Sequence, residues 1–235
     1  MLAKAAGLRF SNDPFWHIAH FDEQATIVDD LLAGRRSIDE VVRRYPAYFS
    51  AQIIKDPNFS FIYPELEHRF PDSPRLFIVR DPRQNIRSIL NRLRIDGRLE
   101  ALGPQQERAL DHARGWQAIL AGDGLGISHG SHIARLAQRW NLAIERYWER
   151  RSSIRLVRYE DFLADKSGCI ADLAEDLGLQ VVRDIHDEQD RQFQPRGNRS
   201  VTPEQFFGRH NLALIESICA EGMARFGYEP SLAHA

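Results

Sequence analysis

One short segment sets the fold class of this chain. Residues 76–79 (Leu-Phe-Ile-Val) are consecutive apolar residues between a Pro-Asp-Ser-Pro turn and Arg80-Asp-Pro, which predicts a buried strand over residues 76–80. Asp81 can cap the next helix and Pro82 suits its first position, so we expect a helix over residues 82–93. A buried strand that runs directly into a helix is typical of α/β proteins with parallel strands.

The rest of the chain repeats the alternation of strands and helices. Short apolar segments at residues 52–55 and 154–159 predict two more strands. Capping boxes that begin at Ser37 and Thr202 predict the starts of two helices. We therefore expect a single α/β domain over residues 1–235, with a mostly parallel sheet flanked by helices.

Composition limits the classes of ligand and the location of the protein. With 31 Lys and Arg against 33 Asp and Glu, the net charge is -2, which argues against a nucleic-acid partner. No apolar run could span a bilayer and no signal peptide begins the chain, so we expect no membrane span and a cytoplasmic location. The cysteines, Cys169 and Cys219, suit buried thiols in a reducing compartment, and no Cys/His cluster has zinc-ligand spacing.

The junction after residues 76–79 is the first candidate binding site. The strand delivers Arg80 to the carboxyl edge of the predicted sheet, where α/β proteins bind ligands, and the next helix carries Ser88. A guanidinium, a hydroxyl and the amides of a helix N-terminus together suit a phosphate group. The alternative is that Arg80 pairs with a carboxylate and Ser88 is an ordinary surface serine.

Five segments of the chain, taken in order, carry a family resemblance. Arg80 and Ser88 stand eight positions apart across the strand–Asp-Pro–helix junction. The other four segments are a lysine-containing strand end at residues 55–57, an Arg-Tyr-Glu-Asp strand end at 157–162, an Arg-Gly segment at 193–197 and a segment with Phe-Gly-Tyr-Glu at 222–229. Together they resemble the sulfotransferases that use 3′-phosphoadenosine-5′-phosphosulfate (PAPS), from about residue 50 to the C-terminus with weak similarity around residues 95–130.

The resemblance implies a three-layer fold of the P-loop-NTPase type. It implies that PAPS donates a sulfuryl group to a hydroxyl or amine of a small-molecule or glycan acceptor, and that no metal is needed. Arg80, Ser88 and Arg196 would hold the donor's 3′-phosphate. Gly197 would let the backbone approach that phosphate, and Tyr159 would either pack near the adenine or simply fill the core.

Three residues are candidates for catalysis. Lys55 matches the family's lysine and would stabilise the bridging oxygen of the leaving phosphate; the alternative is a solvated surface lysine. Many family members use a carboxylate or histidine as the base in the segment after the first helix, which here contains Asp13 and His17. The alternatives are that Asp13 caps a helix and that His17 is only partly exposed. A histidine two positions after the lysine is absent because Pro57 stands there.

The chain departs from the family pattern at one point. The family begins with a strand and a glycine-rich loop around the 5′-phosphosulfate, and no segment matches them; residues 1–8 resemble the end of the following helix. We expect that the first strand and loop are missing, either because the chain starts too late or because this member has lost them and catalysis with them. A non-catalytic nucleotide-binding protein of the same fold is the main alternative function. A small kinase is a weaker one, because no Gly-x-x-x-x-Gly-Lys-Ser/Thr loop is present.

Overall fold

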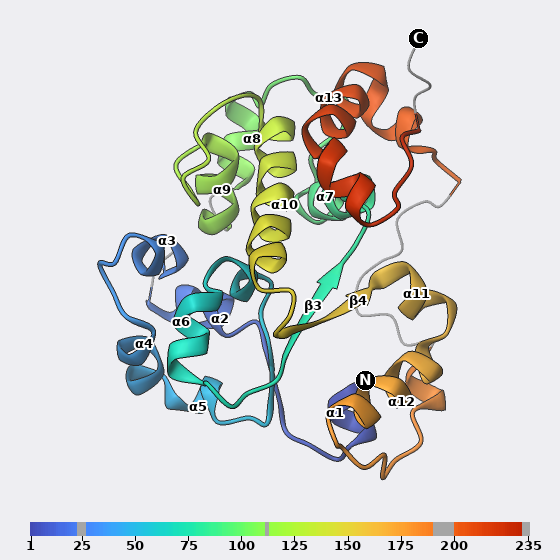
Figure 1. The fold of residues 1–235 in the computed structure, drawn as a ribbon. Coiled ribbons are helices and arrows are strands. Elements are labelled where there is room, and N and C mark those ends of the chain that lie inside the picture. Colours follow the sequence, from blue (N-terminus) through green and yellow to red (C-terminus); the bar gives the residue numbers. More distant parts are fainter. Residues whose placement is uncertain (23–26, 111–112, 190–199, 232–235) are drawn as a thin grey trace. The chain divides into compact units, whose positions relative to one another are not determined.

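The protein is a mostly helical α/β protein (Figure 1). The computed structural model describes residues 1–22, 27–110, 113–189 and 200–231. Within these ranges there are thirteen α-helices, two short 3-10 helices and four strands, which form two parallel two-stranded sheets. No helix in the same ranges combines the length and the apolar character needed to cross a membrane.

The chain folds into two compact units. Met1–Val79 and Arg146–Gln194 form one unit, and Arg80–Glu145 and Pro195–Ala235 form the other. All four described strands lie in the first unit, which we call the sheet unit, and we call the second the helical unit. One boundary follows Val79 and another falls within α10 (His132–Glu149). The single domain expected over residues 1–235 stays a prediction.

The first sheet of the sheet unit pairs two strands from the N-terminal part of the chain. β1 (Phe10–Asn12) lies parallel to β2 (Ile53–Lys55), with Asn12 opposite Lys55. The strand predicted at residues 52–55 is confirmed. β1 was not predicted, because three residues with a single apolar side chain give no period that could be recognised.

The second sheet pairs β3 (Arg75–Val79) with β4 (Ile154–Arg158), again in parallel. Both strands are confirmed, and their parallel orientation agrees with the mostly parallel sheet that was expected, although the described strands form two separate pairs. Alternate residues of a strand face opposite sides, and here Phe77 is buried while Ile78 is 57% exposed. The expectation that residues 76–79 are buried on both faces is therefore wrong, since apolar packing covers one face of β3.

Short helices surround these strands within the sheet unit. The capping box at Ser37 is confirmed: its hydroxyl accepts the N–H of Glu40, whose carboxylate accepts the N–H of Ser37. The helices are α1 (Leu2–Ala5), α2 (Pro14–Asp22), α3 (Ile27–Leu32), α4 (Ile38–Arg44), α5 (Pro46–Phe49), η1 (Pro57–Phe61), α6 (Tyr63–Arg69), α11 (Tyr159–Ala164), α12 (Lys166–Asp176) and η2 (His186–Glu188). One core cluster joins α1, β4 and α12 through Leu2, Ala5, Val157, Ile170, Leu173, Ala174 and Ile185.

The helical unit is built around α7 (Pro82–Leu93) and α13 (Pro203–Arg225), which pack together. α7 has the bounds predicted for it, and the Thr202 capping box begins α13. α13 is kinked at Gly208, where φ is 70°, a left-handed conformation that glycine adopts without strain. The unit also contains α8 (Pro104–Ala109), α9 (Arg114–Ala121) and most of α10.

Candidate functional site

Three of the four described strands end in the same way, with a polar residue followed by Asp-Pro. These junctions are residues 12–14 after β1, 55–57 after β2 and 80–82 after β3. In each, the proline is the first residue of the helix that follows, where its fixed φ is favourable and its missing N–H costs nothing. The junctions therefore present Asn12, Lys55 and Arg80 just before the aspartates.

Asp56 connects the ends of the first sheet. Its carboxylate accepts the N–H of Phe15 at 2.9 Å and both the N–H and the side-chain amide of Asn58, at 2.9 and 3.0 Å. Asp56 is buried, and burial raises its carboxyl pKa although these hydrogen bonds oppose the shift. This buried carboxylate holds the first turn of α2 against the end of β2.

Asp13 and Lys55, two of the predicted catalytic residues, contact each other. Lys55 Nζ lies 2.7 Å from Asp13 Oδ1, and the amide of Asn12 donates to the other carboxylate oxygen at 3.0 Å. The Asp13 N–H also donates to the Lys55 carbonyl at 2.7 Å. The pair is partly open to solvent, with side-chain exposures of 47% for Lys55 and 22% for Asp13. Lys55 is thus paired with a carboxylate and partly exposed to solvent.

The backbone at Asp13 is in the left-handed region, with φ at 49°. Aspartate and asparagine adopt this conformation more readily than other residues with a side chain, because their short polar groups form local hydrogen bonds. The conformation lies between β1 and α2, where the chain must change direction. Strained backbone of this kind clusters at functional sites.

His17, the third predicted catalytic residue, lies in the first turns of α2, and its N–H donates to the Asp13 carbonyl at 3.2 Å. Phe15, near the start of the same helix, is buried. The His17 ring stacks on Tyr48, with 5.7 Å between centroids and an angle of 8°. Trp16 meets the His17 ring edge-on at 4.9 Å and is 53% exposed. We call Asn12, Asp13, Trp16, His17, Tyr48 and Lys55 the Asp13 site.

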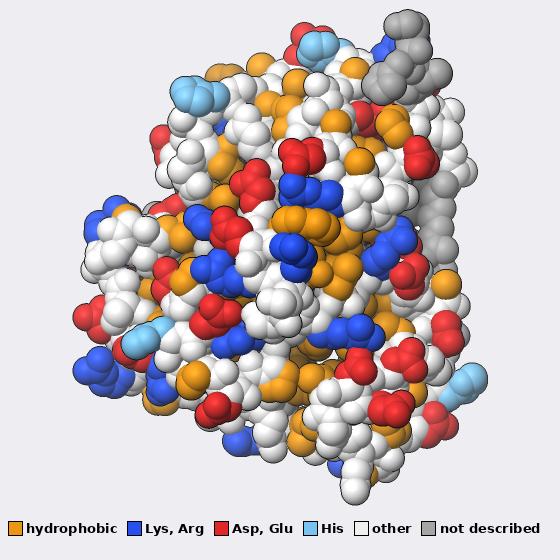
Figure 2. Space-filling view, viewed as in Figure 1, with side chains coloured by type: hydrophobic (Ala, Val, Ile, Leu, Met, Phe, Trp, Pro, Cys, Tyr) orange, Lys and Arg blue, Asp and Glu red, His pale blue; other side chains and the backbone are white. Residues whose placement is uncertain are grey.

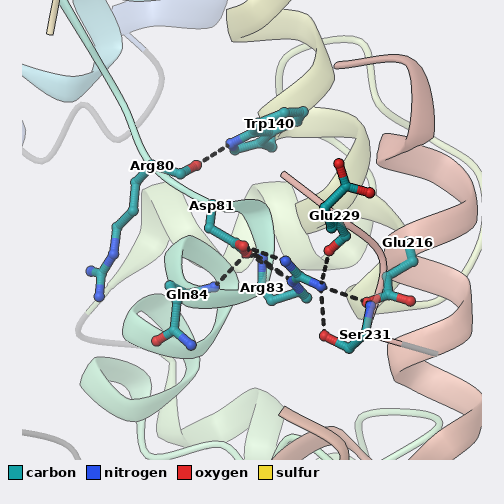
Figure 3. Close-up of polar contacts among 8 residues, drawn as sticks. All are labelled: Arg80, Asp81, Arg83, Gln84, Trp140, Glu216, Glu229 and Ser231. Carbon is teal, nitrogen blue, oxygen red and sulfur yellow. Dashed lines mark hydrogen bonds and ion pairs between the residues drawn. The ribbon is translucent and has the colours of Figure 1, made fainter. Parts of the chain in front are cut away.

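The third junction belongs to the helical unit (Figure 3). The Arg80 carbonyl accepts the indole N–H of Trp140 at 2.9 Å, and the Arg80 side chain points away from Asp81. The Asp81 carboxylate caps α7 by accepting the N–H groups of Arg83 and Gln84, at 2.8 and 3.4 Å. The predicted cap by Asp81 is therefore confirmed, and its carboxylate accepts two of the amides that were also expected to suit a phosphate.

Arg83 forms a buried ionic network that sequence reasoning missed (Figure 3). Its guanidinium contacts Asp81 at 2.5 Å, Glu216 at 2.8 Å, the hydroxyl of Ser231 at 2.6 Å and the carbonyl of Glu229 at 2.9 Å. Burial lowers the pKa of Arg83, but the hydrogen bonds and charges of Asp81 and Glu216 outweigh it and leave the pKa raised. The network ties α7 to α13 and to the segment that follows α13.

Arg87 brings a second guanidinium close to Arg80. Burial lowers the pKa of Arg87, and the positive charge of Arg80 lowers it further. Arg87 donates to the Val201 carbonyl at 2.8 Å, and its guanidinium lies 4.9 Å from the ring centre of Phe206. Ser88, the next residue of α7, is half-buried. Arg87 stands seven positions after Arg80, and this spacing did not mark it as a candidate in the sequence.

The remaining predicted site residues are distributed as follows. Tyr159 begins α11 in the sheet unit, is half-buried and lies 6.3 Å from Phe162 between ring centroids. Arg196 and Gly197 lie outside the described residues. The structure thus pairs Lys55 with Asp13 in the sheet unit and links His17 to Asp13 through the backbone, whereas Arg80 and Ser88 belong to the helical unit.

The helical unit also buries a histidine that the sequence did not single out. His132, the first residue of α10, is 2% exposed, and neither ring nitrogen has a hydrogen-bond partner among the described residues. Burial lowers its pKa to about 4, and the positive charge of Arg135 adds to this. His132 is therefore neutral at pH 7.

Basic, acidic and hydrophobic side chains are intermixed on the face of the molecule shown in Figure 2. Among the described residues no group of three or more His, Cys, Asp or Glu side chains could hold a metal ion. None of the four described strand-to-helix turns contains a glycine. An anionic ligand must therefore be held by a few specific side chains.

Comparison with known proteins identifies no relative. No family model matches the chain, and no curated protein and no solved structure is detectably similar to it.

Proposed function

We propose that this chain is a sulfotransferase that moves a sulfuryl group from PAPS to an acceptor hydroxyl. The observation that carries the proposal is the Asp13–Lys55 ion pair, at 2.7 Å, where two parallel strands end. Sulfuryl transfer needs a base for the acceptor proton and a positive charge for the leaving phosphate oxygen. A carboxylate and an ammonium side by side, both partly exposed, supply these two groups.

The two side chains have complementary roles in the proposed reaction. PAPS supplies a sulfuryl group whose bond to the phosphate oxygen breaks as the acceptor oxygen bonds to sulfur. Asp13 takes the proton of the acceptor hydroxyl, and Lys55 stabilises the negative charge that remains on the phosphate. A phosphate competes with Asp13 for the Lys55 ammonium, so donor binding frees the carboxylate to act as a base. His17, held by Tyr48, is the second candidate base.

Arg80 and Ser88 are the proposed contacts of the 3′-phosphate. Burial, and then the positive charge of Arg80, lower the pKa of Arg87. This repulsion between two guanidiniums supports an anion at this position, because a negative charge would relieve it. Arg196, Gly197 and Tyr159 keep the roles that the family resemblance implies. The three-layer P-loop type of fold also belongs to the proposal, and the parallel pairing of both sheets supports it.

Calorimetry with two nucleotides tests the phosphate site. Adenosine 3′,5′-bisphosphate should bind the full chain more tightly than adenosine 5′-monophosphate, which lacks the 3′-phosphate. Arg80→Ala should weaken the bisphosphate tenfold or more, since hydrogen bonds to charged groups contribute about 1.5–3 kcal/mol, and should abolish the difference between the nucleotides. Arg92→Ala, an exposed arginine in the last turn of α7, is the matched control. Equal binding of both nucleotides to the unmodified chain would refute the site.

Donor consumption tests the catalytic pair. We expect the chain to release adenosine 3′,5′-bisphosphate from PAPS in the presence of an acceptor. Asp13→Asn should retain nucleotide binding but lose transfer, and Lys55→Met should lose transfer as well. His17→Gln separates the two candidate bases. If transfer survives Asp13→Asn and is lost in His17→Gln, the base is His17 and the role given to Asp13 is wrong.

A non-catalytic nucleotide-binding protein is the second candidate. The absence of glycine from all four described strand-to-helix turns favours it, because close approach of the backbone to a phosphosulfate usually requires glycine. If this candidate is correct, adenosine 3′,5′-bisphosphate binds in a way that depends on Arg80, and no PAPS is consumed whichever acceptor is added.

A further inference from the structure

We infer that Trp140 is a positioning residue that directs Arg80 towards the donor's 3′-phosphate, and that α13 holds Trp140 in place through Gly222. The inference rests on the proposed function, and it adds two residues that touch no substrate themselves. The sequence alone left Trp140 as either a pocket residue or a core residue.

Arg80 lies between two elements and belongs to neither. β3 ends at Val79, and Asp81 is the N-cap of α7. The carbonyl of Arg80 accepts the indole N–H of Trp140 at 2.9 Å, and its side chain points away from Asp81 (Figure 3). Because the direction of a side chain follows from the backbone at its own Cα, a hydrogen bond that fixes this carbonyl also limits where the guanidinium can point.

The hydrogen bond to Arg80 satisfies a buried donor. Trp140 is 5% exposed, and a buried indole N–H usually has an acceptor, since leaving it unpaired would be costly. The two residues stand 60 positions apart in the chain. Phenylalanine would supply a ring to the same core but could not donate, so the two aromatic residues differ in what they can do for Arg80.

α13 packs directly against the indole at Gly222. This glycine lies within the helix, where it is less favourable than any residue except proline. A methyl group at Gly222 would lie 2.5 Å from Cζ3 and 3.0 Å from Cη2 of Trp140, whereas carbon atoms in contact are about 3.5–4.0 Å apart. The close approach of the indole therefore explains the glycine.

Two further contacts hold α10 against α13 beside the indole. The side-chain amide of Asn141 donates to the Ile218 carbonyl at 2.6 Å, and the Cys219 thiol donates to the Ala137 carbonyl at 3.7 Å. Spacings of three and four residues place Ala137 and Asn141 on the side of α10 that carries Trp140. The packing of two helices of the helical unit thus sets the position of the indole.

The direction of Arg80 matters for one phosphate and not for the other. A guanidinium binds phosphate through N–H groups in a fixed planar arrangement, so its contribution depends on how it is presented. Adenosine 5′-monophosphate has no 3′-phosphate and gains nothing from it. A displaced Arg80 carbonyl should therefore lower the preference for adenosine 3′,5′-bisphosphate without weakening the monophosphate.

Calorimetry of the full chain with these two nucleotides tests the inference. The readout is the ratio of their dissociation constants. Trp140→Phe removes the N–H and keeps a ring, and we expect the ratio to fall about threefold to tenfold, the contribution of one hydrogen bond. Trp148→Phe makes the same change in the last turns of α10 and should leave the ratio unchanged. Circular dichroism checks that each variant is folded.

Gly222→Ala tests how the indole is held. The added methyl group should displace the indole and lower the ratio as Trp140→Phe does. Phenylalanine lacks the Cζ3 and Cη2 atoms that this methyl group would meet, so Gly222→Ala should cause no further fall when it is combined with Trp140→Phe. Falls of equal size in both backgrounds would show that Gly222 does not act through Trp140.

Hydrogen exchange of the indole N–H gives a readout without any nucleotide. Its NMR resonance is assigned by its loss in Trp140→Phe. We expect slow exchange with solvent in the unmodified chain, because the group is buried and hydrogen-bonded, and faster exchange in Gly222→Ala. Fast exchange in the unmodified chain would overturn the positioning role.

Two binding results also overturn the inference. In one, the unmodified chain prefers the bisphosphate and Trp140→Phe keeps the full preference. In the other, Trp140→Phe weakens both nucleotides equally, as loss of core packing alone would do. Failure of the proposed function looks different: the unmodified chain binds both nucleotides equally. That result would remove the phosphate site together with the role of Trp140 in selectivity, while slow exchange would still show that the indole holds the Arg80 carbonyl.

Discussion

The two units of this protein each pair a basic side chain with a carboxylate, but in opposite surroundings. In the helical unit, Arg83 is buried with Asp81 and Glu216, whose side chains are 14% and 7% exposed. In the sheet unit, Lys55 and Asp13 are exposed by 47% and 22%. The interatomic distances are similar, at 2.8 Å for Arg83–Glu216 and 2.7 Å for Lys55–Asp13.

The difference lies in what each pair can do. A buried ion pair cannot exchange its partner, because separation leaves an uncompensated charge in the interior. A partly exposed pair contributes little to stability and can exchange its partner for a ligand at small cost. Proximity alone therefore does not identify a functional ion pair, and exposure decides between the structural and the chemical role.

The buried network should show the largest effect on stability. Arg83→Met leaves the buried carboxylate of Glu216 and the partly buried carboxylate of Asp81 without their cation, and we expect the free energy of unfolding to fall by about 3–5 kcal/mol. Urea denaturation followed by circular dichroism measures this. Arg92→Met, an exposed substitution in the same helix, should change stability by less than about 0.5 kcal/mol. A similar small effect for both variants would remove the distinction between the two pairs.

His132 should make the stability of the helical unit depend on pH. Its pKa in the folded protein is about 4, below the ordinary value of 6.5, so the unfolded state binds the proton first as the pH falls. Stability is then fully present above pH 6.5 and declines towards pH 4, by on the order of 3 kcal/mol. The contribution should disappear in His132→Leu and persist in His129→Gln, which replaces an exposed histidine. Identical pH profiles for wild type and His132→Leu would contradict it.

Asp56, the buried carboxylate in the junction after β2, provides a test of the same kind in the sheet unit. In Asp56→Asn, the new side-chain NH2 group faces one of the N–H groups that now donate to the carboxylate. We therefore expect the free energy of unfolding to fall by about 1–3 kcal/mol. Because the folded-state pKa of Asp56 is raised, its ionisation opposes folding, so its contribution to stability falls as the pH rises above 3.8. Asparagine should remove that dependence. Thermal unfolding at several pH values measures both effects, with the exposed Asp172→Asn as the control.

The exposed pair should show the smallest effect on stability. Asp13→Asn keeps a residue that tolerates the positive φ and should change the free energy of unfolding by less than about 1 kcal/mol. Asp176→Asn, which breaks the exposed Arg155–Asp176 pair at 2.8 Å, is the matched comparison. A loss of several kcal/mol from Asp13→Asn would mean that this pair is as structural as the Arg83 network.

The sequence predicted which residues belong to the candidate site, but it did not predict how they are arranged. Lys55, Asp13 and His17 were each expected from the sequence, but the contact between Lys55 and Asp13 depends on β1, which has no recognisable pattern. The cap that Asp81 forms on α7 was predicted, and its carboxylate accepts two of the amides that were also expected to suit a phosphate. The sequence alone could not show how these amides are shared between a cap and a ligand, because both uses require the same residues.

The sequence by itself determined the features that depend on short-range interactions. The capping boxes at Ser37 and Thr202, the Asp-Pro start of α7 and the strand at residues 75–79 all depend on residues a few positions apart. Only the tertiary structure decided which distant residues meet, as Arg83 does with Glu216 across 133 positions and Lys55 with Asp13 across 42. The physical reason is that local backbone preferences act before packing, whereas burial and the pairing of charges depend on how all the elements pack together.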